Sequence, residues 1–466
     1  MELMRIPVTV VILAAGLGTR MKSRRAKVLH RAGGRTLVGH VVQTALELAP
    51  PERVFVVVGH QGDEVRNAIP TAGIGFIEQK EQLGTGHAVI RGRDALAGLD
   101  GYLLVLYGDC PLLRVETLRR LIAQEAAGDA GCVLLTAKMD DPTGYGRVIR
   151  GADGAVRAIV EQKAGTPEQL AIREANMGIY CFDAAAFWKH AGEIGTYNPA
   201  GEYYLTDMAE ILTRAGRRVE ALAIDDAGEA LGINTRVELA QVDRILRDRK
   251  RRALMLDGVT IENPETVLID ADASVGMDTV IGPFAQILGA TTIGENCRVG
   301  ACSIVSDSQI GDGVEIGAFS MVGRSVVERN AVIGPFARLR MDNHVGEGAH
   351  VGNFVELKKT SMGPGAKANH LAYLGDSRIG AKSNIGAGTI TCNYDGFDKH
   401  PTTIGDGAFI GSNSTLVAPV EIGDGAYTAA GSVITRAVPP DALAFGRARQ
   451  EVKEGWVKQR RERRKK

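Results

Sequence analysis

The first residues that could do chemistry form a glycine-rich turn, Leu13–Met21, which follows an apolar run and precedes a basic run that ends at Lys27. Backbone N–H groups in such a turn can approach phosphates closely, and a helix that starts there would add a favourable dipole. A dinucleotide-binding fingerprint needs a third glycine where this chain has Met21, and the P-loop spacing is absent. The turn alone is therefore open to two interpretations, a phosphate loop or a tight turn that needs glycine for geometry only.

Three further segments favour the phosphate loop. Lys27 could supply a counter-charge to a triphosphate, although a lone lysine is commonly solvated. Gln79–His87 combines side-chain amides with Gly-Thr-Gly, which suits contacts to a base edge but also suits a surface turn. Asp109 ends the apolar run that starts at Tyr102, so it should lie at the carboxyl end of a strand, where open α/β sheets bind ligands. An aspartate there can hold Mg²⁺ together with phosphate oxygens, and the alternative is a helix N-cap or a turn residue.

The second candidate for chemistry is His370, which lies in the segment Lys358–Asp376. A reaction that removes a proton needs a base to accept it, and histidine suits this task near neutral pH. Such a base typically contributes ~10²–10⁴-fold to the rate. The alternative is a loop histidine without any chemistry.

The residues of the first group must be positioned by a sheet. Residues 1 to about 235 contain short apolar runs that suit strands buried on both faces of a parallel sheet. Leu37–Ala49, between the first two runs, has helical spacing, and this strand–helix–strand repetition predicts a doubly wound α/β sheet. Residues 236–252 carry apolar residues at helical spacing without glycine or proline, which predicts one connecting helix. The apolar runs are Val8–Leu13, Val54–Val58 and Leu103–Tyr107.

From about residue 253 the aliphatic residues recur every six positions, commonly with glycine directly after them. Neither a helix nor an ordinary strand has this period, whereas a solenoid of triangular coils turns one aliphatic side chain inward per six-residue side. The period is lost at 359–372 and 391–403, which we expect to be loops that leave the coil and carry chemistry. The in-phase runs are Val275, Ile281, Ile287, Ile293, Val299 and Val305; Ile310, Ile316 and Val322; Val327, Ile333, Leu339, Val345, Val351 and Leu357; and Ile404, Ile410, Leu416 and Ile422.

The coil also bears on a zinc alternative for His370. Some hexapeptide solenoids are carbonic anhydrases, and a catalytic zinc site would need His344, His350 and His370 to converge. Six residues make one side of a triangular coil, so His344 and His350 should lie on adjacent sides rather than together. The spacing therefore argues against metal hydration chemistry.

Composition limits the setting and the partners. The chain has 466 residues, with 55 Lys+Arg and 55 Asp+Glu, so its formal net charge is zero. Nucleic-acid binding through phosphates usually needs a basic surplus. The local exception is the basic tail from Lys458 to Lys466, which is typical of a solvated end. The six cysteines show no C-x-x-C spacing, and neither a signal peptide nor a membrane-spanning run is evident. We therefore expect a cytoplasmic protein that binds neither nucleic acid nor membranes.

Several motifs carry a resemblance to a known family. With the repeats and Gly455-Trp456, they closely resemble the bifunctional N-acetylglucosamine-1-phosphate uridylyltransferase/glucosamine-1-phosphate N-acetyltransferase family over essentially the whole chain. The motifs occur in the family's order as Leu13–Met21, Gln79–His87, Tyr107–Leu112, Gly144–Val148, Asn176–Ile179 and Gly232–Arg236.

The resemblance implies a fold and an assembly. It implies a Rossmann-like nucleotidyltransferase domain (1–235), a linker helix (236–252), a left-handed parallel β-helix acetyltransferase domain (253–446) and a basic C-terminal tail (447–466). It further implies a homotrimer through the β-helices. Physics gives partial support, because an acetyl-CoA site on the outer face of a solenoid is shallow and a neighbouring subunit would deepen it.

The resemblance also implies the reactions. The C-terminal half would acetylate glucosamine-1-phosphate from acetyl-CoA. The N-terminal half would then join the product to UTP with Mg²⁺ and release pyrophosphate, a transfer that depends on positioning and charge neutralisation. The product, UDP-N-acetylglucosamine, feeds peptidoglycan and, where it is made, lipopolysaccharide.

The resemblance finally implies site residues, position by position. The uridine and triphosphate contacts fall on Leu13, Ala14, Ala15, Gly16, Lys27, Gln79, Gly84 and Thr85. The sugar-phosphate contacts fall on Tyr107, Gly146, Glu161 and Asn176, and the Mg²⁺ ligands on Asp109 and Asn234, the latter also a UDP-sugar contact. His370 is the expected base. The amino-sugar phosphate contacts fall on Arg340, Lys358, Tyr373 and Asn384, and the acetyl-CoA contacts on Ala387, Asn393, Tyr394, Ser412, Ala430 and Arg447.

Two departures from the family pattern and two rival interpretations stand beside this prediction. Leu17 replaces a usual lysine, and Arg25-Ala26 replaces a usual Leu-Pro before Lys27.

One rival is a nucleotide-sugar pyrophosphorylase whose β-helix is only regulatory, against which His370 argues. The other is a non-catalytic assembly subunit, against which Lys27, Asp109 and Asn234 argue.

Overall fold

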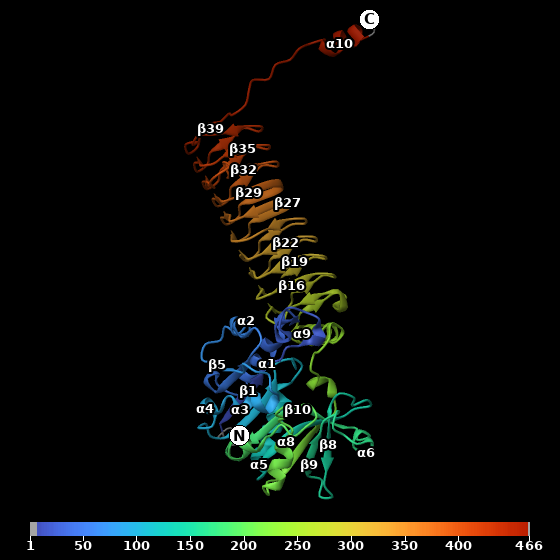
Figure 1. Ribbon diagram of the computed structural model, residues 1–466. Helices are drawn as coiled ribbons and strands as arrows, with labels where there is room; N and C mark the ends of the chain where they lie inside the picture. Colours follow the sequence, from blue (N-terminus) through green and yellow to red (C-terminus); the bar gives the residue numbers. More distant parts are fainter. Residues whose placement is uncertain (1–6, 465–466) are drawn as a thin grey trace. The chain divides into compact units, whose positions relative to one another are not determined.

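The computed structural model describes residues 7–464 and divides into two compact units between Leu246 and Arg247 (Figure 1). The first unit is built on one twisted sheet with the strand order β11-β7-β10-β6-β1-β4-β5, to which the hairpin β8–β9 is joined through β10. Its strands are β1 (Val8–Leu13), β4 (Val54–Val58), β5 (Gly75–Glu78), β6 (Tyr102–Tyr107), β7 (Cys132–Lys138), β8 (Gly146–Arg150), β9 (Val156–Val160), β10 (Glu174–Asp183) and β11 (Val219–Ile224). A small hairpin, β2 (Arg31–Ala32) and β3 (Arg35–Thr36), stands apart.

Helices cover both faces of this sheet. Alternate residues of β1 enter two different cores: Val10 and Ile12 pack with the helices α1, α2 and α5, whereas Val11 and Leu13 pack with α3, α4, α7 and α8. Burial on both faces explains why these strands are continuously apolar. The helices are α1 (Leu37–Leu46), α2 (Gly62–Asn67), α3 (Thr85–Ile90), α4 (Arg93–Leu96), α5 (Val115–Ala127), α6 (Pro167–Leu170), α7 (Ala184–His190) and α8 (Asp207–Arg214).

The predicted doubly wound α/β arrangement is confirmed, but the sheet is not wholly parallel. β1 pairs in parallel with β4 and β6, and β7 pairs in parallel with β11. β10 runs antiparallel to both β6 and β7. A strand buried on both faces reads as a continuous apolar run in either direction, so its composition carries no signal for its orientation.

A long helix, α9 (Arg236–Leu256), extends four residues beyond the predicted end at 252. Its start is a reciprocal cap: Thr235 Oγ1 accepts from the Glu238 N–H at 3.2 Å, and Glu238 Oε2 accepts from the Thr235 N–H at 2.9 Å. Such a capping box satisfies two backbone donors that a helix start otherwise leaves without partners. Within the first unit, Val242 of α9 packs with Met21, which takes the position of the absent third glycine.

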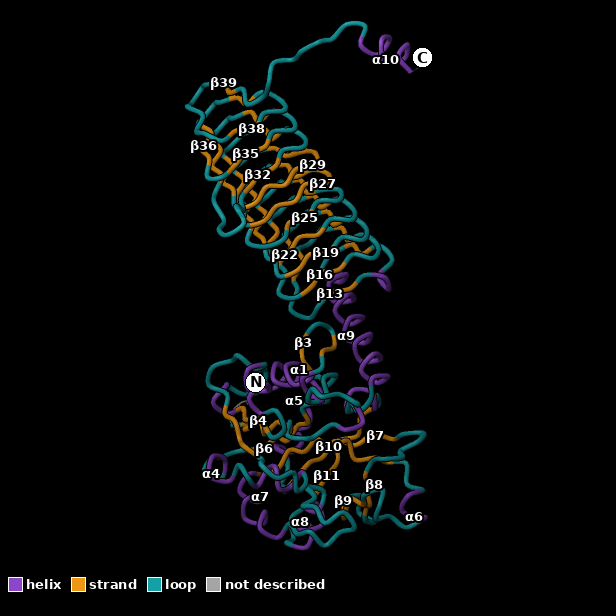
Figure 2. Tube along the Cα trace, turned by 45° about the horizontal axis from the view of Figure 1, so that its top comes forward, coloured by secondary structure: helices purple, strands orange, loops and turns teal. Residues whose placement is uncertain are grey.

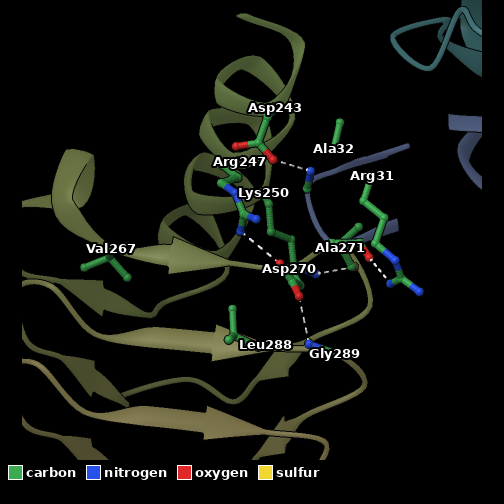
Figure 3. Close-up of polar contacts among 12 residues, drawn as sticks. Arg31, Ala32, Asp243, Arg247, Lys250, Val267, Asp270, Ala271, Leu288 and Gly289 are labelled. Carbon is green, nitrogen blue, oxygen red and sulfur yellow. Dashed lines mark hydrogen bonds and ion pairs between the residues drawn. The ribbon is translucent and has the colours of Figure 1, made fainter. Parts of the chain in front are cut away.

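The last turns of α9 close one end of the second unit. Asp270 accepts from Arg247 Nη1 at 2.9 Å and from the Gly289 backbone N–H at 2.8 Å, so one carboxylate ties the helix to two successive coils (Figure 3). Arg251 Nη1 donates to the carbonyl of Val267 at 2.7 Å. Leu254 enters the apolar core beneath. The helix thus covers an end of a stacked structure that would otherwise expose its core.

The second unit is a parallel β-helix (Figure 2). Residues 16 to 18 apart pair in parallel, as Val280 does with Arg298, and the coil that contains residues 393–401 pairs residues 25 apart. Each turn of the chain therefore lies directly on the previous turn. One long sheet contains β12 (Thr260–Ile261), β13 (Leu268–Ile269), β15 (Val280–Ile281), β16 (Gln286–Leu288), β18 (Arg298–Val299), β19 (Ile304–Ser306), β21 (Glu315–Ile316), β22 (Met321–Gly323), β24 (Val332–Ile333), β25 (Arg338–Leu339), β27 (His350–Lys358), β29 (Lys367–Gly375), β31 (Asn384–Ile385), β32 (Ile390–Cys392), β34 (Phe409–Ile410), β35 (Thr415–Val417), β37 (Tyr427–Thr428), β38 (Val433–Ile434) and β39 (Leu443–Ala444). The second sheet contains β14 (Ser274–Val275), β17 (Thr292–Ile293), β20 (Gln309–Ile310), β23 (Ser325–Val327), β26 (Asn343–Val345), β28 (Ser361–Met362), β30 (Ser377–Ile379), β33 (Thr402–Ile404) and β36 (Val420–Ile422).

The six-residue period is confirmed as the inward position of this coil. Of the aliphatic residues in the predicted runs, Val275 is partly buried and the others are buried in one continuous core. Each side of the coil therefore commits one large aliphatic side chain to the interior, as the spacing requires. A smaller residue two positions earlier is also buried, as at Thr279, Ala285 and Thr291.

One of the two predicted excursions is wrong. Residues 359–372 stay in the coil, because β29 pairs with β27 from His350–Lys367 through Lys358–Gly375. The inward positions here are Met362, Ala368 and Leu374, all buried. The period was missed because Ala368 is not a large aliphatic residue and because the phase slips by one residue before Met362. Residues 393–401 do leave the coil, and an antiparallel bridge joins Tyr394 to Lys399 across the base of this loop.

The chain ends beyond the coil in an exposed basic helix, α10 (Trp456–Arg464). Two residues of the predicted basic tail, Lys465 and Lys466, lie outside the described residues. Over residues 7–464, no helix combines the length and the apolar character that crossing a bilayer requires.

A buried acid in the first unit makes its stability depend on pH. Glu125 of α5 is 2 % exposed, and neither of its carboxyl oxygens has a hydrogen-bond partner. Burial, with the nearby carboxylate of Asp183, raises the pKa of Glu125 to about 8. The unfolded chain releases this proton near pH 4.3. The folded state therefore binds more protons between about pH 4.3 and pH 8, and the free energy of unfolding falls as the pH rises through that window.

Glu125→Gln should remove this pH dependence, because glutamine does not ionise. At pH 8 we expect the variant to unfold with a free energy on the order of 2 kcal/mol above that of the natural chain, with a smaller difference at pH 5. Urea unfolding followed by the fluorescence of Trp188, which is buried in the same unit, measures this. Glu116→Gln, exposed on the same helix, is the matched control. An unchanged pH dependence in Glu125→Gln would contradict the assignment.

Candidate active sites

A cleft of about 300 Å³ opens at the carboxyl ends of β1 and β6. It contains all eight residues predicted to contact uridine and triphosphate, together with Tyr107 and Asp109. Parallel pairing places Leu13 opposite Tyr107, so both strands end at the same edge of the sheet. The lining residues are Leu13, Ala14, Ala15, Gly16, Lys27, Val28, Gln79, Gln82, Gly84, Thr85, Ala88, Tyr107, Asp109 and Glu202.

The glycine-rich turn forms one wall of this cleft. Gly16 faces open space, which leaves room for a ligand against its backbone. Gly18 has φ 61°, and a Cβ at this residue would lie 2.5 Å from Cβ of Lys27, so only glycine fits there. A helix does not start directly after this turn: a single 3₁₀ turn (Thr19–Met21) follows, and α1 starts only at Leu37. Backbone N–H groups, rather than a helix dipole, are what this turn offers to a phosphate.

The segment 79–87 contributes Gln79, Gln82, Gly84 and Thr85 to the same cleft. Gln79 is 3 % exposed, and its Nε2 donates to the carbonyl of Gly84 at 3.0 Å. Gly84 has φ 113° and precedes α3, and a Cβ there would lie 2.5 Å from the carbonyl oxygen of Tyr203. Thr85 Oγ1 accepts from the Leu205 N–H at 3.1 Å. The amide and the glycine are thus held rigidly by their own contacts.

A second cleft, of about 420 Å³, meets the first at Tyr107 and Asp109. It contains the predicted sugar-phosphate residues Gly146, Glu161 and Asn176, and also Asn234. Asn176 Nδ2 donates to the Tyr180 hydroxyl at 2.7 Å, and its Oδ1 accepts from the Gly178 N–H at 3.1 Å. Two ligands bound in the two clefts would therefore meet beside the Asp109 carboxylate.

Cations and oxygen ligands converge where the clefts meet. Lys27 Nζ forms an ion pair with Asp109 Oδ2 and donates to Asn234 Oδ1 at 3.2 Å. Arg20 Nη2 donates to the same Asn234 oxygen at 2.8 Å. One carboxylate oxygen and one amide oxygen thus already share a single cation. Hard oxygen donors of this kind suit Mg²⁺ when phosphate oxygens and waters complete the coordination.

The surroundings raise the pKa of three acidic groups at or near this site. Burial, followed by the charge of Asp109, raises the pKa of Tyr107, so its hydroxyl stays protonated. Burial also raises the pKa of Glu161. Burial, with the carboxylates of Glu210 and Glu161, raises the pKa of Asp207 to about 6. Of these three acids, Tyr107 and Glu161 line the sugar cleft, whereas Asp207 lines neither cleft.

In the second unit, His370 lies on strand β29 and not on a loop. Register places Asn353 of β27 opposite it, and the Asn353 Oδ1 lies 2.8 Å from His370 Nδ1. Because an amide oxygen only accepts, Nδ1 must carry the proton, which leaves Nε2 free to act as a base. The imidazole is exposed on the outside of the coil.

The column of residues above His370 contains most of the predicted acetyl-CoA contacts. The N–H of Gly388 donates to the carbonyl of Leu371 at 2.7 Å, which sets Ala387 on the next coil. The N–H of Asn413 donates to Ala387, and the N–H of Gly431 donates to Ser412, at 2.7 and 2.8 Å. Ala430 follows on the next coil, and Arg447 Cδ lies 3.9 Å from the position that a Cβ would take at Gly431. The stacking thus aligns His370, Ala387, Ser412 and Ala430 along one edge, and the Arg447 side chain reaches its end.

A cationic cluster lies on the neighbouring side of the coil. Lys399, from the loop 393–401, lies beside Lys358 and lowers the pKa of the Lys358 ammonium. Arg340 contributes to the same effect, whereas Asp376 opposes it. Arg340 also pairs with Glu356 at 3.2 Å. Positive groups held this close together are suited to an anion such as a phosphate.

The loop that carries Lys399 is internally braced. Asp395 accepts from the N–H groups of Phe397 and Asp398 and lies 2.8 Å from His400 Nε2. The Asp398 N–H, followed by His400, lowers the pKa of Asp395 to about 2. Asn393 donates to Asp376, and the Tyr394 hydroxyl donates to the Gly396 carbonyl at 2.6 Å. Tyr373 is part of the same region, since a Cβ at Gly375 would contact its hydroxyl and Asn393.

Two predicted residues and the zinc alternative complete the description. Asn384, at the start of β31, pairs with Lys367 and Phe409 and so lies one coil beyond β29. His344 belongs to β26 in the second sheet, where it lies 2.8 Å from Glu328. His350 belongs to β27 in the long sheet. Between residues 7 and 464, no three His, Cys, Asp or Glu side chains gather as a metal site.

Comparisons with known proteins agree with both halves of this description. The MobA-like NTP transferase domain matches residues 10–255, the bacterial transferase hexapeptide (six repeats) matches 401–436, and the GMPPB C-terminal domain matches 263–340. The chain is 74 % identical over 461 residues to the bifunctional protein GlmU of Solibacter usitatus (strain Ellin6076), covering 99 % of each. It is 52 % identical over 460 residues to that of Koribacter versatilis (strain Ellin345), covering 98 % of each.

The fold and the sites define a nucleotidyltransferase joined to a left-handed hexapeptide-repeat acyltransferase. At this identity over nearly the full length, the chain belongs to the GlmU family. It is a bifunctional enzyme of UDP-N-acetylglucosamine biosynthesis, with uridylyltransferase and acetyltransferase activity.

Sequence reasoning missed three residues that the structure brings to these sites. Arg20 lies beside Asn234, Lys399 lies beside Lys358, and Asn353 lies beside His370. Arg20 directly follows the glycine-rich turn, which was a usable signal. Asn353 lies 17 residues before His370, one coil away, so counting coils would have found it.

Asn353→Ala should slow acetyl transfer, because His370 would lose the acceptor that orients its ring and fixes its tautomer. We expect kcat of the acetyl step to fall about tenfold, on the scale of one oriented hydrogen bond to a group that becomes charged. Uridylyl transfer from supplied N-acetylglucosamine-1-phosphate is the control and should be unchanged. Asn353→Asp keeps an acceptor and should retain most of the rate. An undiminished kcat in Asn353→Ala would contradict this role.

Proposed function

We propose that the chain makes UDP-N-acetylglucosamine in two steps with the site residues named above. The β-helix acetylates glucosamine-1-phosphate from acetyl-CoA, and the first unit joins the product to UTP and releases pyrophosphate. We retain 1–235 and 253–446 as the two catalytic domains, 236–252 as the linker and 447–466 as a basic tail. The observation that carries the proposal is the meeting of two clefts at Asp109, because an in-line transfer needs two ligands joined at one point.

In the uridylyl step, an oxygen of the sugar-1-phosphate attacks the α-phosphorus of UTP and pyrophosphate leaves. Gln79, Gly84 and Thr85 would hold the uridine, and the backbone of Ala14–Gly16 would lie along the phosphates. Glu161, Asn176 and Gly146 would hold the sugar in the second cleft. Such transfers rest on positioning and on neutralising charge, which is why the site supplies amides and cations rather than a nucleophile.

Mg²⁺ is part of this proposal. Asp109 and Asn234 are the residues that would hold it, and their oxygens already converge on one cation, the Lys27 ammonium. When bound, the metal would neutralise phosphate charge. Lys27 and Arg20 would bring further positive charge to the same phosphates.

In the acetyl step, the amine of glucosamine-1-phosphate attacks the thioester carbonyl, and the sulfur of CoA leaves. His370 Nε2 would accept the proton that the amine loses, with its Nδ1–H held by Asn353. Arg340, Lys358, Tyr373 and Asn384 would bind the sugar phosphate. Ala387, Ser412, Ala430 and Arg447 would contact acetyl-CoA along the column above His370, and Asn393 and Tyr394 would contact it from the braced loop.

We further propose a homotrimer through the β-helices in a cytoplasmic setting. The six cysteines are free thiols, which fits a reducing compartment. Phe319, Phe336 and Phe354 stack at 5.2 and 5.3 Å along one edge of the coil, each about half exposed. A continuous exposed apolar edge marks a contact surface. His370 follows Phe354 by one coil in the adjacent column, so a subunit packed on this edge would also shield the base.

The decisive experiment supplies glucosamine-1-phosphate, acetyl-CoA, UTP and Mg²⁺ and measures UDP-N-acetylglucosamine. His370→Ala should lower acetyl transfer by about 10²–10⁴-fold. Uridylyl transfer from added N-acetylglucosamine-1-phosphate should be unchanged in the same variant. Chelation of divalent metal should have the opposite pattern, with loss of uridylyl transfer and retention of acetyl transfer.

The result also separates the rival functions. Uridylyl transfer without acetyl transfer in the natural chain would favour a pyrophosphorylase with a regulatory β-helix. Absence of both activities would favour a non-catalytic assembly subunit. Uridylyl transfer that survives chelation would contradict the assignment of Asp109 and Asn234 to a metal.

Phe336→Asp should weaken the proposed trimer, because a charge would be placed in the centre of the stacked phenylalanine column. We expect the variant to sediment as a smaller species at micromolar concentration and to lose acetyl transfer while it keeps uridylyl transfer. Tyr197→Asp, a fully exposed aromatic residue of the first unit, is the control. A natural chain that sediments as a monomer, or an unchanged trimer in Phe336→Asp, would contradict the proposal.

A further inference from the structure

The loop that leads to Lys27 is held by a side chain from another part of the chain. Gln61, directly before α2, reaches this loop with both ends of its amide. Its Oε1 accepts from the Ala26 N–H at 2.5 Å, and its Nε2 donates to the carbonyl of Arg24 at 3.1 Å. The two bonds enclose Arg25 and end one residue before Lys27. A single amide therefore fixes the backbone on which Lys27 depends.

The backbone of Ala26 has the shape that proline would impose. Its angles are φ −54° and ψ 138°, and its side chain is 1 % exposed. Proline holds φ at about −65 ± 15° and has no N–H to donate. Alanine has no such restriction and pays more conformational entropy when it is ordered. Here the N–H that proline would lack is bonded to Gln61, so the hydrogen bond supplies the restriction that a ring would supply.

Lys27 itself is confined from its other sides. Its Cβ packs against the backbone of Gly18, where no side chain would fit. Its Nζ reaches Asp109 and Asn234. The remaining freedom lies in the backbone before it, and this is the part that Gln61 holds. A shift of the loop would move the ammonium away from the junction of the two clefts.

Within residues 7–464, the hydrogen bonds of the Gln61 side chain go to the Lys27 loop. It precedes α2 with φ 55° but does not cap that helix with its side chain. The first turn of α2 is stabilised by backbone bonds instead, such as the one from the Val65 N–H to the Gln61 carbonyl at 3.1 Å. Loss of the amide should therefore affect the Lys27 loop rather than α2.

We propose that Gln61 is a positioning residue for uridylyl transfer, which places Lys27 by binding the N–H of Ala26. Gln61 lines neither cleft, so it acts only through Lys27. The inference rests on the proposed role of Lys27 at the UTP phosphates. It explains how Lys27 is held in place in a chain that has alanine at position 26: the hydrogen bond from Ala26 to Gln61 restricts the backbone before the lysine.

The test is a double-mutant cycle between Gln61 and Ala26, read as KM for UTP and kcat of uridylyl transfer. Gln61→Ala should raise KM for UTP about tenfold, the scale of a lost pair of backbone-orienting hydrogen bonds. Ala26→Pro restores the backbone restriction by itself. The double variant Gln61→Ala/Ala26→Pro should therefore return to within about threefold of the natural chain. Asn67→Ala, exposed at the far end of α2, is the matched control.

Each outcome decides the matter. An unchanged KM in Gln61→Ala, or a double variant no better than Gln61→Ala, overturns the inference. Lys27→Ala tests the proposed role of Lys27 separately from the role of Gln61. If that variant binds UTP normally, the role of Lys27 is contradicted, and so is the inference that depends on it. Acetyl transfer should stay at the natural rate in every variant, which shows that the second unit is folded. Urea unfolding followed by Trp188 fluorescence should show that the first unit is folded in each variant.

Discussion

Both sites depend on the register of parallel strands. In the first unit, the pairing of Leu13 with Tyr107 ends two strands at the same edge, and the polar residues that follow them meet there. In the second unit, the same kind of pairing sets His370 opposite Asn353 and stacks the next coils above them. A slip of one residue would turn every side chain to the opposite face. The hydrophobic residues that specify register therefore also specify which polar groups meet.

The two sites differ in how charge is arranged around them. At the junction of the clefts, Lys27, Arg20, Asp109 and Asn234 form a compact network in which positive charge is held close to oxygen ligands. At the β-helix, an imidazole is exposed on the outside of the coil, and its Nδ1 is held by an amide oxygen rather than by a charge. The first arrangement suits the transfer of a charged group and the second suits the removal of a proton near neutral pH.

Much of this could be predicted from sequence because it is periodic or local. The six-residue repeat of aliphatic residues could arise from no common element other than a coil, and Asp109 followed an obvious strand. The features that the sequence did not predict depend on distant contacts or on residues with no distinctive type. Ala368 is too small to mark an inward position, so the sequence of this regular coil resembles that of a loop. The orientation of β10 depends on its partners and not on its composition. Gln61 lies 35 residues from Ala26, and no pattern links the two.

The stacking of coils has a consequence for ligand length. Parallel strands are about 4.8 Å apart, so the edge from His370 through Ala387 and Ser412 to Ala430 measures roughly 14 Å in three equal increments. Equivalent positions along this edge are therefore separated by whole coils. If acetyl-CoA binds along this edge as proposed, the positions that can contact it change only in steps of one coil, when whole turns of the chain are added or deleted.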